Sequence, residues 1–335
     1  MDFLLDALEA MPLQDTEMSW GTLGTIRPFP NFRPERDARQ IAVAMANKDV
    51  SSLVRVLTNR TNAQRQQIAE MYRGVTGQEL VPNLKRALSG EVETVLLGLM
   101  MTPAVFDAHQ LRNAMEGLGT DEEVLVEVLS TRSAAQLQQI AAAYRDEFQR
   151  DLEKDIRGET SQGFRELLLA LLQKEEENMK GIIDYRLIER DAKALLERSR
   201  KKPDTAAWIR VLTRRDSDHL GRVLDRFQAL SGRPAEEAVQ SDFSGDLRQG
   251  LLSLVQSIRS TPELLAGSLH KAMKGLGRKD GVLIRILVSR SEVDLLSIRV
   301  QYCRQQGRSL YSTLQEKVKG DYQQALLALC SAEDL

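Results

Sequence analysis

The sequence predicts an all-α fold of four repeats of about 70 residues, each holding about five short helices. A leucine-containing segment that ends in an arginine and a polar residue occurs four times, at Arg60, Arg132, Arg215 and Arg290. These arginines are 72, 83 and 75 residues apart, which is too long for most solenoid repeats, so each repeat must contain several helices. The β-branched alternation typical of strands is absent.

Helical periodicity runs through the repeats, and the second repeat illustrates it. Apolar residues recur there at three-and-four spacing, with breaks at Gly or Ser/Thr clusters. This pattern predicts helices over residues 107–115, 123–129, 134–144, 152–157 and 164–172. The other repeats end in apolar helices over 94–100, 249–255 and 324–329. Because one repeat buries only a thin core by itself, we expect the four to pack into one compact body.

The repeats divide the chain into a head, four modules and a linker. We expect a head over residues 1–33, repeats over 34–103, 104–176, 187–260 and 261–335, and a linker over 177–186. The end of the head is rich in Gly, Pro and Asn, so we expect no regular structure there. The linker lies in a stretch that begins with several charges and separates two pairs of repeats.

Composition excludes several functional classes. No apolar run reaches the ~18 residues that span a bilayer, and the acidic N-terminus does not resemble a secretory signal. Two cysteines, Cys303 and Cys330, are too few for a disulfide framework and suit a reducing cytoplasm. The formal charge of −2 leaves no global field for nucleic acid, so a charged partner must meet a local patch. His109, His219 and His270 lie in different repeats without a catalytic constellation, so we expect no enzyme.

The loop after the first helix of the second repeat has a metal-binding pattern. Its two glycines allow successive carbonyl oxygens of Met115, Gly117 and Gly119 to point at one spot. Glu159 lies 44 residues beyond Met115 and can close the shell from another helix. Such an all-oxygen site suits calcium, and one carboxylate leaves room for water or a phosphate oxygen, because calcium takes ~6–8 oxygens. The alternative is a glycine helix cap that needs no metal.

The start of the next helix fixes this loop. Thr120 stands three residues before Glu123, a spacing typical of a capping box in which each side chain bonds the other residue's main chain. We therefore expect Thr120 to be the N-cap residue.

At these residues the chain resembles the annexins. The resemblance rests on the four repeats, the Gly-x-Gly-Thr loop at 117–120 with its distant acid, and the segments 273–277 and 319–322. It covers about residues 30–333. It implies a slightly curved helical disc whose convex face carries the loops and docks on acidic phospholipid through calcium, with the head on the concave side. The resemblance assigns calcium ligation to Met115, Gly117, Gly119 and Glu159.

The first and third repeats depart from the annexin pattern. The first loop, residues 45–50, is two residues shorter and has no glycine, and Ala87 stands at the position of the acid. In the third repeat, the basic segment 198–203 replaces the loop, although Asp242 remains as an acid.

The fourth repeat keeps Gly275 and Gly277 but has Arg278 in place of the threonine and Lys317 in place of the acid. A lysine ammonium would repel the cation that it should bind. We therefore predict one calcium site of this kind, in the second repeat.

Basic residues accumulate in the two degenerate loops. We hypothesise that they face lipid and bind it without calcium, at about 1 kcal/mol per residue and with strong screening by salt. The set is Arg198, Arg200, Lys201, Lys202, Lys274, Arg278 and Lys279. A solvated connection broken by Pro203 explains the third loop equally well.

Three other features leave alternatives open. Apolar residues of the head form one stripe, so residues 2–11 are predicted to be an amphipathic helix. Family analogy suggests that this helix docks on a small dimeric EF-hand protein. Packing on the protein's own core, or disorder, is equally compatible with the sequence.

Trp208 can contact lipid or pack inside its repeat. For the four repeated arginines we favour capping of helix carbonyls over anion binding.

The function predicted from the sequence is peripheral binding to acidic phospholipid from the cytoplasm. Calcium acts at the second repeat, and the basic loops of the third and fourth repeats contribute without calcium. The alternative is a protein-interaction scaffold that has lost most calcium and lipid binding.

Overall fold

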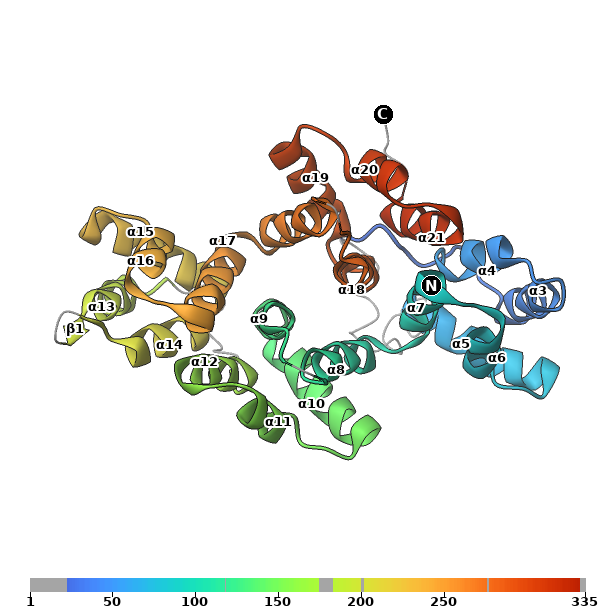
Figure 1. The fold of residues 1–335 in the computed structure, drawn as a ribbon, viewed down its shortest axis with the longest axis horizontal. Helices are drawn as coiled ribbons and strands as arrows, with labels where there is room; N and C mark the ends of the chain where they lie inside the picture. The colour runs from blue at the N-terminus through green and yellow to red at the C-terminus, as the bar shows by residue number, and fades with distance from the viewer. Residues whose placement is uncertain (1–22, 118, 175–182, 200–201, 276, 332–335) are drawn as a thin grey trace, which may run out of the picture. The chain divides into compact units, whose positions relative to one another are not determined.

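The computed structural model describes residues 23–117, 119–174, 183–199, 202–275 and 277–331 (Figure 1). These residues are almost entirely helical, which confirms the all-α prediction. The described strands are the two-residue pair β1 (Arg198–Ser199) and β2 (Lys202–Pro203), which run antiparallel. None of the helices in these ranges combines the length and apolar composition needed to cross a membrane.

Each of the first two repeats consists of five helices. The first contains α3 (Pro34–Ala46), α4 (Val50–Leu57), α5 (Asn62–Thr76), α6 (Leu80–Ala87) and α7 (Gly90–Met100). The second contains α8 (Pro103–Ala114), α9 (Glu122–Thr131), α10 (Ala134–Phe148), α11 (Leu152–Glu159) and α12 (Gln162–Leu172).

The third and fourth repeats follow the same plan but share α17 (Gly245–Met273). Ser260 inside α17 has φ −165° and ψ 103°, so this segment is two helices joined at a kink next to Pro262. The third repeat contains α13 (Tyr185–Leu196), α14 (Thr205–Thr213), α15 (Ser217–Ser231), α16 (Ala235–Asp242) and the first part of α17. The fourth contains the rest of α17, α18 (Asp280–Arg290), α19 (Leu295–Gln306), α20 (Leu310–Lys317) and α21 (Gly320–Cys330).

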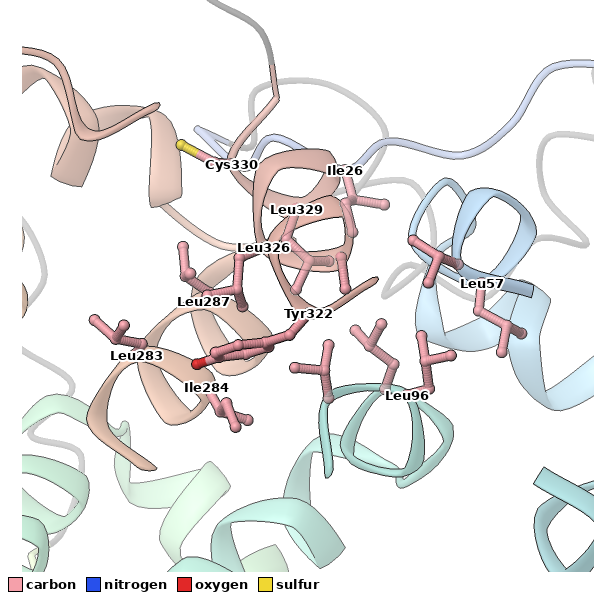
Figure 2. Close-up of a cluster of buried hydrophobic side chains, with 14 of the residues drawn as sticks. Ile26, Leu57, Leu96, Leu283, Ile284, Leu287, Tyr322, Leu326, Leu329 and Cys330 are labelled. Carbon is pink, nitrogen blue, oxygen red and sulfur yellow. The ribbon is translucent and has the colours of Figure 1, made fainter. Parts of the chain in front are cut away.

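The four repeats form two pairs, and each pair shares one hydrophobic core. The chain divides into unit 1, residues 1–103 with 265–335, and unit 2, residues 104–264. In unit 1, α21 contacts α4 and α7, and α18 contacts α7. Figure 2 shows Tyr322 and Leu326 of α21 between Leu287 of α18 and Leu96 of α7. In unit 2, α12 contacts α9 and α14. The first repeat is therefore completed by the fourth, and the second by the third.

The repeated arginines hold the first two helices of a repeat together through carboxylates. Three pairs share one geometry, with the arginine Nε donating to the aspartate: Arg60–Asp37 at 2.6 Å, Arg132–Asp107 at 2.6 Å and Arg215–Asp191 at 2.9 Å. In the fourth repeat Leu265 stands where the aspartate should be, and Arg290 instead pairs with Asp294 at 2.6–2.7 Å. The expectation of a structural role is met, but the main partner is a carboxylate and not a helix carbonyl.

Trp208 packs inside the third repeat. Only 2% of it is exposed, and its Nε1 donates to the carbonyl of Leu195 at 3.0 Å. Its ring makes edge contacts with Phe227 and Phe243, at centroid distances of 5.6 and 5.5 Å. Of the two alternatives for this residue, the structure shows packing.

Residues 23–33, here called the strap, bind to unit 1 without regular structure. The Ile26 amide donates to the Ser291 carbonyl at 2.9 Å, and the Thr25 hydroxyl donates to the Leu329 carbonyl at 2.6 Å. Phe29 covers the guanidinium of Arg60, 3.6 Å from the ring centroid. The strap thus joins the first and fourth repeats. The predicted amphipathic helix at residues 2–11, with its EF-hand partner, lies outside the described residues.

Candidate functional site

The loop between α8 and α9 has a backbone that requires glycine. Gly117 and Gly119 have φ values of 101° and 96°, in a region that side chains with a Cβ rarely adopt. The amide of Asp121 donates to the carbonyl of Ala114 at 2.8 Å and closes the loop. The glycines noted in the sequence therefore serve a tight turn between α8 and α9.

The N-cap of α9 is Asp121, one residue later than predicted. Its carboxylate accepts from the amide of Val124 at 3.2 Å, so the predicted capping box of Thr120 and Glu123 is wrong. The hydroxyl of Thr120 instead donates to the main-chain carbonyl of Glu159 at 3.2 Å. This bond ties the loop to Glu159, the last residue of α11.

A buried carboxylate anchors the helix that carries Glu159. Asp155, one turn earlier on α11, accepts from Arg150 at 2.7 Å and from the Tyr144 hydroxyl at 2.6 Å. The Arg150 hydrogen bonds hold the pKa of Asp155 below its ordinary value of 3.8. Burial and the bond to Asp155 raise the pKa of Tyr144 to about 12. Arg112, in the last turn of α8, lies 3.6 Å from Asp155 and so links the two helices that flank the site.

The residues of this loop fit a calcium ion. In the described part of the chain, no hydrogen bond ends on the carbonyl oxygens of Met115, Gly117 or Gly119. Met115 is buried, whereas Glu159 is exposed. The donor set is made of hard oxygens with one carboxylate, which is the set that calcium prefers.

The fourth repeat reproduces part of the same loop with different chemistry. The amide of Lys279 donates to the Ala272 carbonyl at 2.9 Å, and Gly275 has the same φ of 96° as Gly119. Gly277, however, does not have positive φ. Arg278 replaces the threonine tether, because its Nη1 donates to the main-chain carbonyl of Lys317 at 2.6 Å.

The charge of Arg278 is compensated inside the protein. Its Nε and Nη2 donate to the two carboxylate oxygens of Asp280 at 2.5 and 3.1 Å. The guanidinium also lies over the ring of Tyr322, 5.7 Å from the centroid. The ion pair with Asp280 raises the pKa of Arg278. Sequence reasoning missed Asp280, although it follows Arg278 by only two residues.

In the third repeat the acid is also taken by arginine. Asp242 accepts from Arg198 at 2.5 Å and from Arg233 at 2.6 Å, so two guanidinium groups occupy the carboxylate that a cation would need. The acid positions of the four repeats are structurally equivalent, since each is the last residue of its helix: Ala87 in α6, Glu159 in α11, Asp242 in α16 and Lys317 in α20.

The first repeat closes its shorter loop in a similar way. The amide of Asp49 donates to the carbonyl of Ala44 at 2.9 Å, and its carboxylate caps α4 by accepting from Ser52. Lys48, with φ 55°, takes the left-handed turn without glycine.

The predicted lipid-facing residues divide into paired and exposed groups. Arg198 and Arg278 are in the ion pairs described above. Lys202, Lys274 and Lys279 are exposed, and none of them forms an ion pair within the described ranges. Arg200 and Lys201 lie outside the described residues. Among the described residues of these loops, the lysines carry the uncompensated charge.

Comparison with known proteins agrees with the repeat geometry. A sequence profile described as Annexin matches residues 36–99, 106–171, 190–254 and 265–329. Human Annexin A9 is 43% identical over 332 residues, which cover 98% of this chain and 96% of that protein. The structure of annexin III has a TM-score of 0.89 and 38% identity, over 93% of this chain and 98% of that one. A calcium-bound annexin (Sm)1 has a TM-score of 0.85 and 29% identity, over 94% of both chains. Four matched repeats and a relative of this identity over nearly the whole chain show that the chain belongs to the annexin family, whose members generally bind phospholipid with calcium.

Proposed function

We propose that this annexin attaches peripherally to acidic phospholipid through calcium held by the second repeat. Exposed lysines of the third and fourth loops add an attraction that needs no calcium. The observation that carries the proposal is the hydrogen bond from Thr120 to the Glu159 carbonyl, which joins the glycine loop to its acid. No equivalent arrangement of glycine turn, threonine and carboxylate exists in the other described loops.

The donor set defines what each residue does. The carbonyls of Met115, Gly117 and Gly119 and the carboxylate of Glu159 would hold the ion. One carboxylate does not neutralise a divalent cation, and calcium takes ~6–8 oxygens, so positions remain for phosphate oxygens of a lipid headgroup. Bound calcium supplies the positive centre at the surface. Asp155 and Arg112 keep α11 and α8 in register so that the ligands meet. The calcium in the similar annexin (Sm)1 supports this assignment.

The electrostatic contribution depends on the lysines. Lys202, Lys274 and Lys279 are each worth about 1 kcal/mol near an anionic leaflet at low salt. Arg198 and Arg278 add less, because Asp242 and Asp280 neutralise them. Attraction of this kind falls away when salt shortens the Debye length to about 8 Å or less.

Vesicle sedimentation tests the calcium part. Wild-type protein is mixed with phosphatidylserine/phosphatidylcholine vesicles in calcium and in chelator. We expect Glu159→Gln to lose most of the calcium-promoted pelleting, while Glu237→Gln, an exposed carboxylate at the start of α16, pellets like the wild type. Equal calcium-promoted pelleting of Glu159→Gln and wild type contradicts the assignment.

The lysine part is tested in chelator at low and at physiological salt. We expect wild-type pelleting at low salt to fall in K274Q/K279Q and to persist in K85Q/K154Q, which removes two exposed lysines outside the third and fourth loops. Absence of wild-type pelleting under every condition would favour the protein-interaction scaffold.

A further inference from the structure

A basic cavity lies between helices of the third repeat, away from its loop. Its volume is about 760 Å³, and its lining comes from α13, from α14 with the two residues after it, and from the residue that follows α12. Figure 1 labels these three helices. The residues that line it are Gln173, Arg190, Asp191, Ala194, Arg210, Val211, Arg214 and Arg215. Half of this lining is arginine, and all of it belongs to unit 2.

Three of these arginines have no acidic partner within ion-pair distance in the described part of the chain. Asp191 is the only acid among the lining residues, and it is already bound by Arg215 at 2.9 Å and His219 at 3.1 Å. Arg190, Arg210 and Arg214 are exposed and form no ion pair among the residues that the structure describes.

Helix electrostatics do not account for this cluster. Arginines near the end of α14 can favour the negative end of its dipole. Arg190, however, lies on α13. Arg210 is in the last turn of α14 and Arg214 is the C-cap residue after it, so the two are four residues apart, a spacing at which like charges repel. An anion placed among the three would remove this repulsion.

The other repeats do not offer the same set of groups. Counting from the repeated arginine and its aspartate, the second repeat has Phe106, Glu127 and Thr131 in place of the three arginines. The first repeat has two arginines and Asn59, and Phe29 of the strap covers Arg60 there. The fourth repeat has Leu264, Arg285 and Ser289 at these positions, so the set of three arginines is particular to the third repeat.

We propose that this cavity binds a small ligand with clustered phosphate groups, such as an inositol polyphosphate. A guanidinium group binds phosphate oxygens with two parallel hydrogen bonds. A phosphate monoester carries about −1.5 to −2 charges at neutral pH, so two or three such groups on one ring match three arginines. The volume is within the roughly 300–1,000 Å³ of small-molecule sites, and Ala194 and Val211 provide an apolar surface for the ring.

The cavity acts separately from the membrane-facing loops. The loop of the third repeat ends before Thr205, the first residue of α14. Arg214 lies nine residues after Thr205, which corresponds to about 14 Å along the axis of the helix. Binding therefore does not need calcium and leaves the loops accessible. The same headgroup on a lipid is a second source of the ligand.

Isothermal titration calorimetry with inositol hexakisphosphate, in chelator and physiological salt, tests the proposal. We expect R210Q/R214Q to bind at least about tenfold more weakly than wild type, because it loses charged hydrogen bonds to the phosphate oxygens. R186Q/R222Q, which removes two exposed arginines outside the cavity, should bind like wild type. Circular dichroism verifies that each variant is folded. Equal binding by wild type and R210Q/R214Q, or equal losses in both double variants, overturns the proposal.

Two further arms define the ligand. R210K/R214K keeps the charge but loses the two-pronged geometry, and it should recover only part of the affinity. Polyglutamate should compete poorly with inositol hexakisphosphate for the cavity. If polyglutamate displaces the bound inositol hexakisphosphate as efficiently as another inositol phosphate does, the assignment to phosphate is overturned.

Recruitment of the protein in chelator to vesicles that contain a phosphorylated inositol lipid, if lost in R210Q/R214Q, identifies the lipid headgroup as a source of the ligand. Binding of only the soluble probe identifies the free phosphate ester.

Discussion

The guanidinium of Arg278 donates to the main-chain carbonyl of Lys317 over 2.6 Å. This bond links the same two structural positions as the bond from Thr120 to Glu159 in the second repeat. A fixed side-chain cation therefore closes the fourth loop, whereas a neutral hydroxyl closes the second loop, where we propose a calcium ion. Both loops keep the same amide closure to the end of their first helix.

This relationship predicts that the fourth site can be restored. R278T/K317E restores the threonine of the second repeat, removes two positive charges and supplies the missing acid, so we expect one additional calcium ion per chain in calorimetric titration. R304T/K85E makes the same charge change on exposed residues outside the loop and should leave the stoichiometry unchanged. An unchanged stoichiometry in R278T/K317E would show that the loop backbone, in which Gly277 lacks the positive φ of Gly119, does not adapt.

Gly24 is predicted to be essential for strap binding. A Cβ at this position would lie 2.6 Å from the Glu292 carbonyl carbon and 2.7 Å from the Ser291 oxygen. Main-chain atoms cannot move aside cheaply, so Gly24→Ala should cost about 1–3 kcal/mol and lower the melting temperature. The matched control is Gly74→Ala on α5, where a Cβ meets nothing within 4 Å and helix propensity should rise. Similar melting temperatures for the two variants would contradict this account of the strap.

Asp155 should make stability depend on acid. Its pKa is lowered in the folded protein, chiefly by Arg150, so the unfolded chain binds the proton more readily. The stabilisation is complete above the ordinary value of 3.8 and is lost as pH falls through the lower folded value. Asp155→Asn should therefore cost about 1–3 kcal/mol near pH 7, and the difference from wild type should shrink in acid. Thermal melting between pH 3 and pH 7 measures it, and a difference independent of pH would be evidence against this ion pair.

Trp208 should report a buried environment that lipid does not reach. In Trp20→Phe it is the only remaining tryptophan. Because its ring packs between Phe227 and Phe243, we expect blue-shifted fluorescence that acrylamide quenches poorly and that does not change on vesicle addition with calcium. A spectral shift on vesicle binding would restore the alternative of an interfacial tryptophan.

The repeats were predictable because their signals are local or strictly periodic. The spacing of the four arginines and the helical periodicity depend on sequence alone, and they led to the observed five-helix plan. The N-cap of α9 was misplaced by one residue because Thr120 and Asp121 are both good capping residues. Capping propensity does not decide between two adjacent residues that both cap helices well. The hydroxyl of Thr120 instead donates a hydrogen bond to the main-chain carbonyl of Glu159, 39 residues away.

The partners of the basic residues were less predictable. Arg198 pairs with Asp242 across 44 residues, and such distant ion pairs depend on how helices pack. The cavity of the third repeat has the same origin, since Arg190 and Arg214 belong to different helices. The sequence showed an excess of positive charge on the loops, but only the fold showed which charges are compensated.

The shared core of the first and fourth repeats has a consequence for the order of folding. Leu57 and Leu96 of the first repeat pack in the same cluster as Leu326 of α21. During synthesis the first repeat must wait until all of residues 104–264 have been made before its partner emerges, whereas the second and third repeats follow one another directly. Unit 2 is therefore able to mature while the chain is still growing, and the first repeat keeps an uncovered apolar surface for the longest time, when chaperones are needed most.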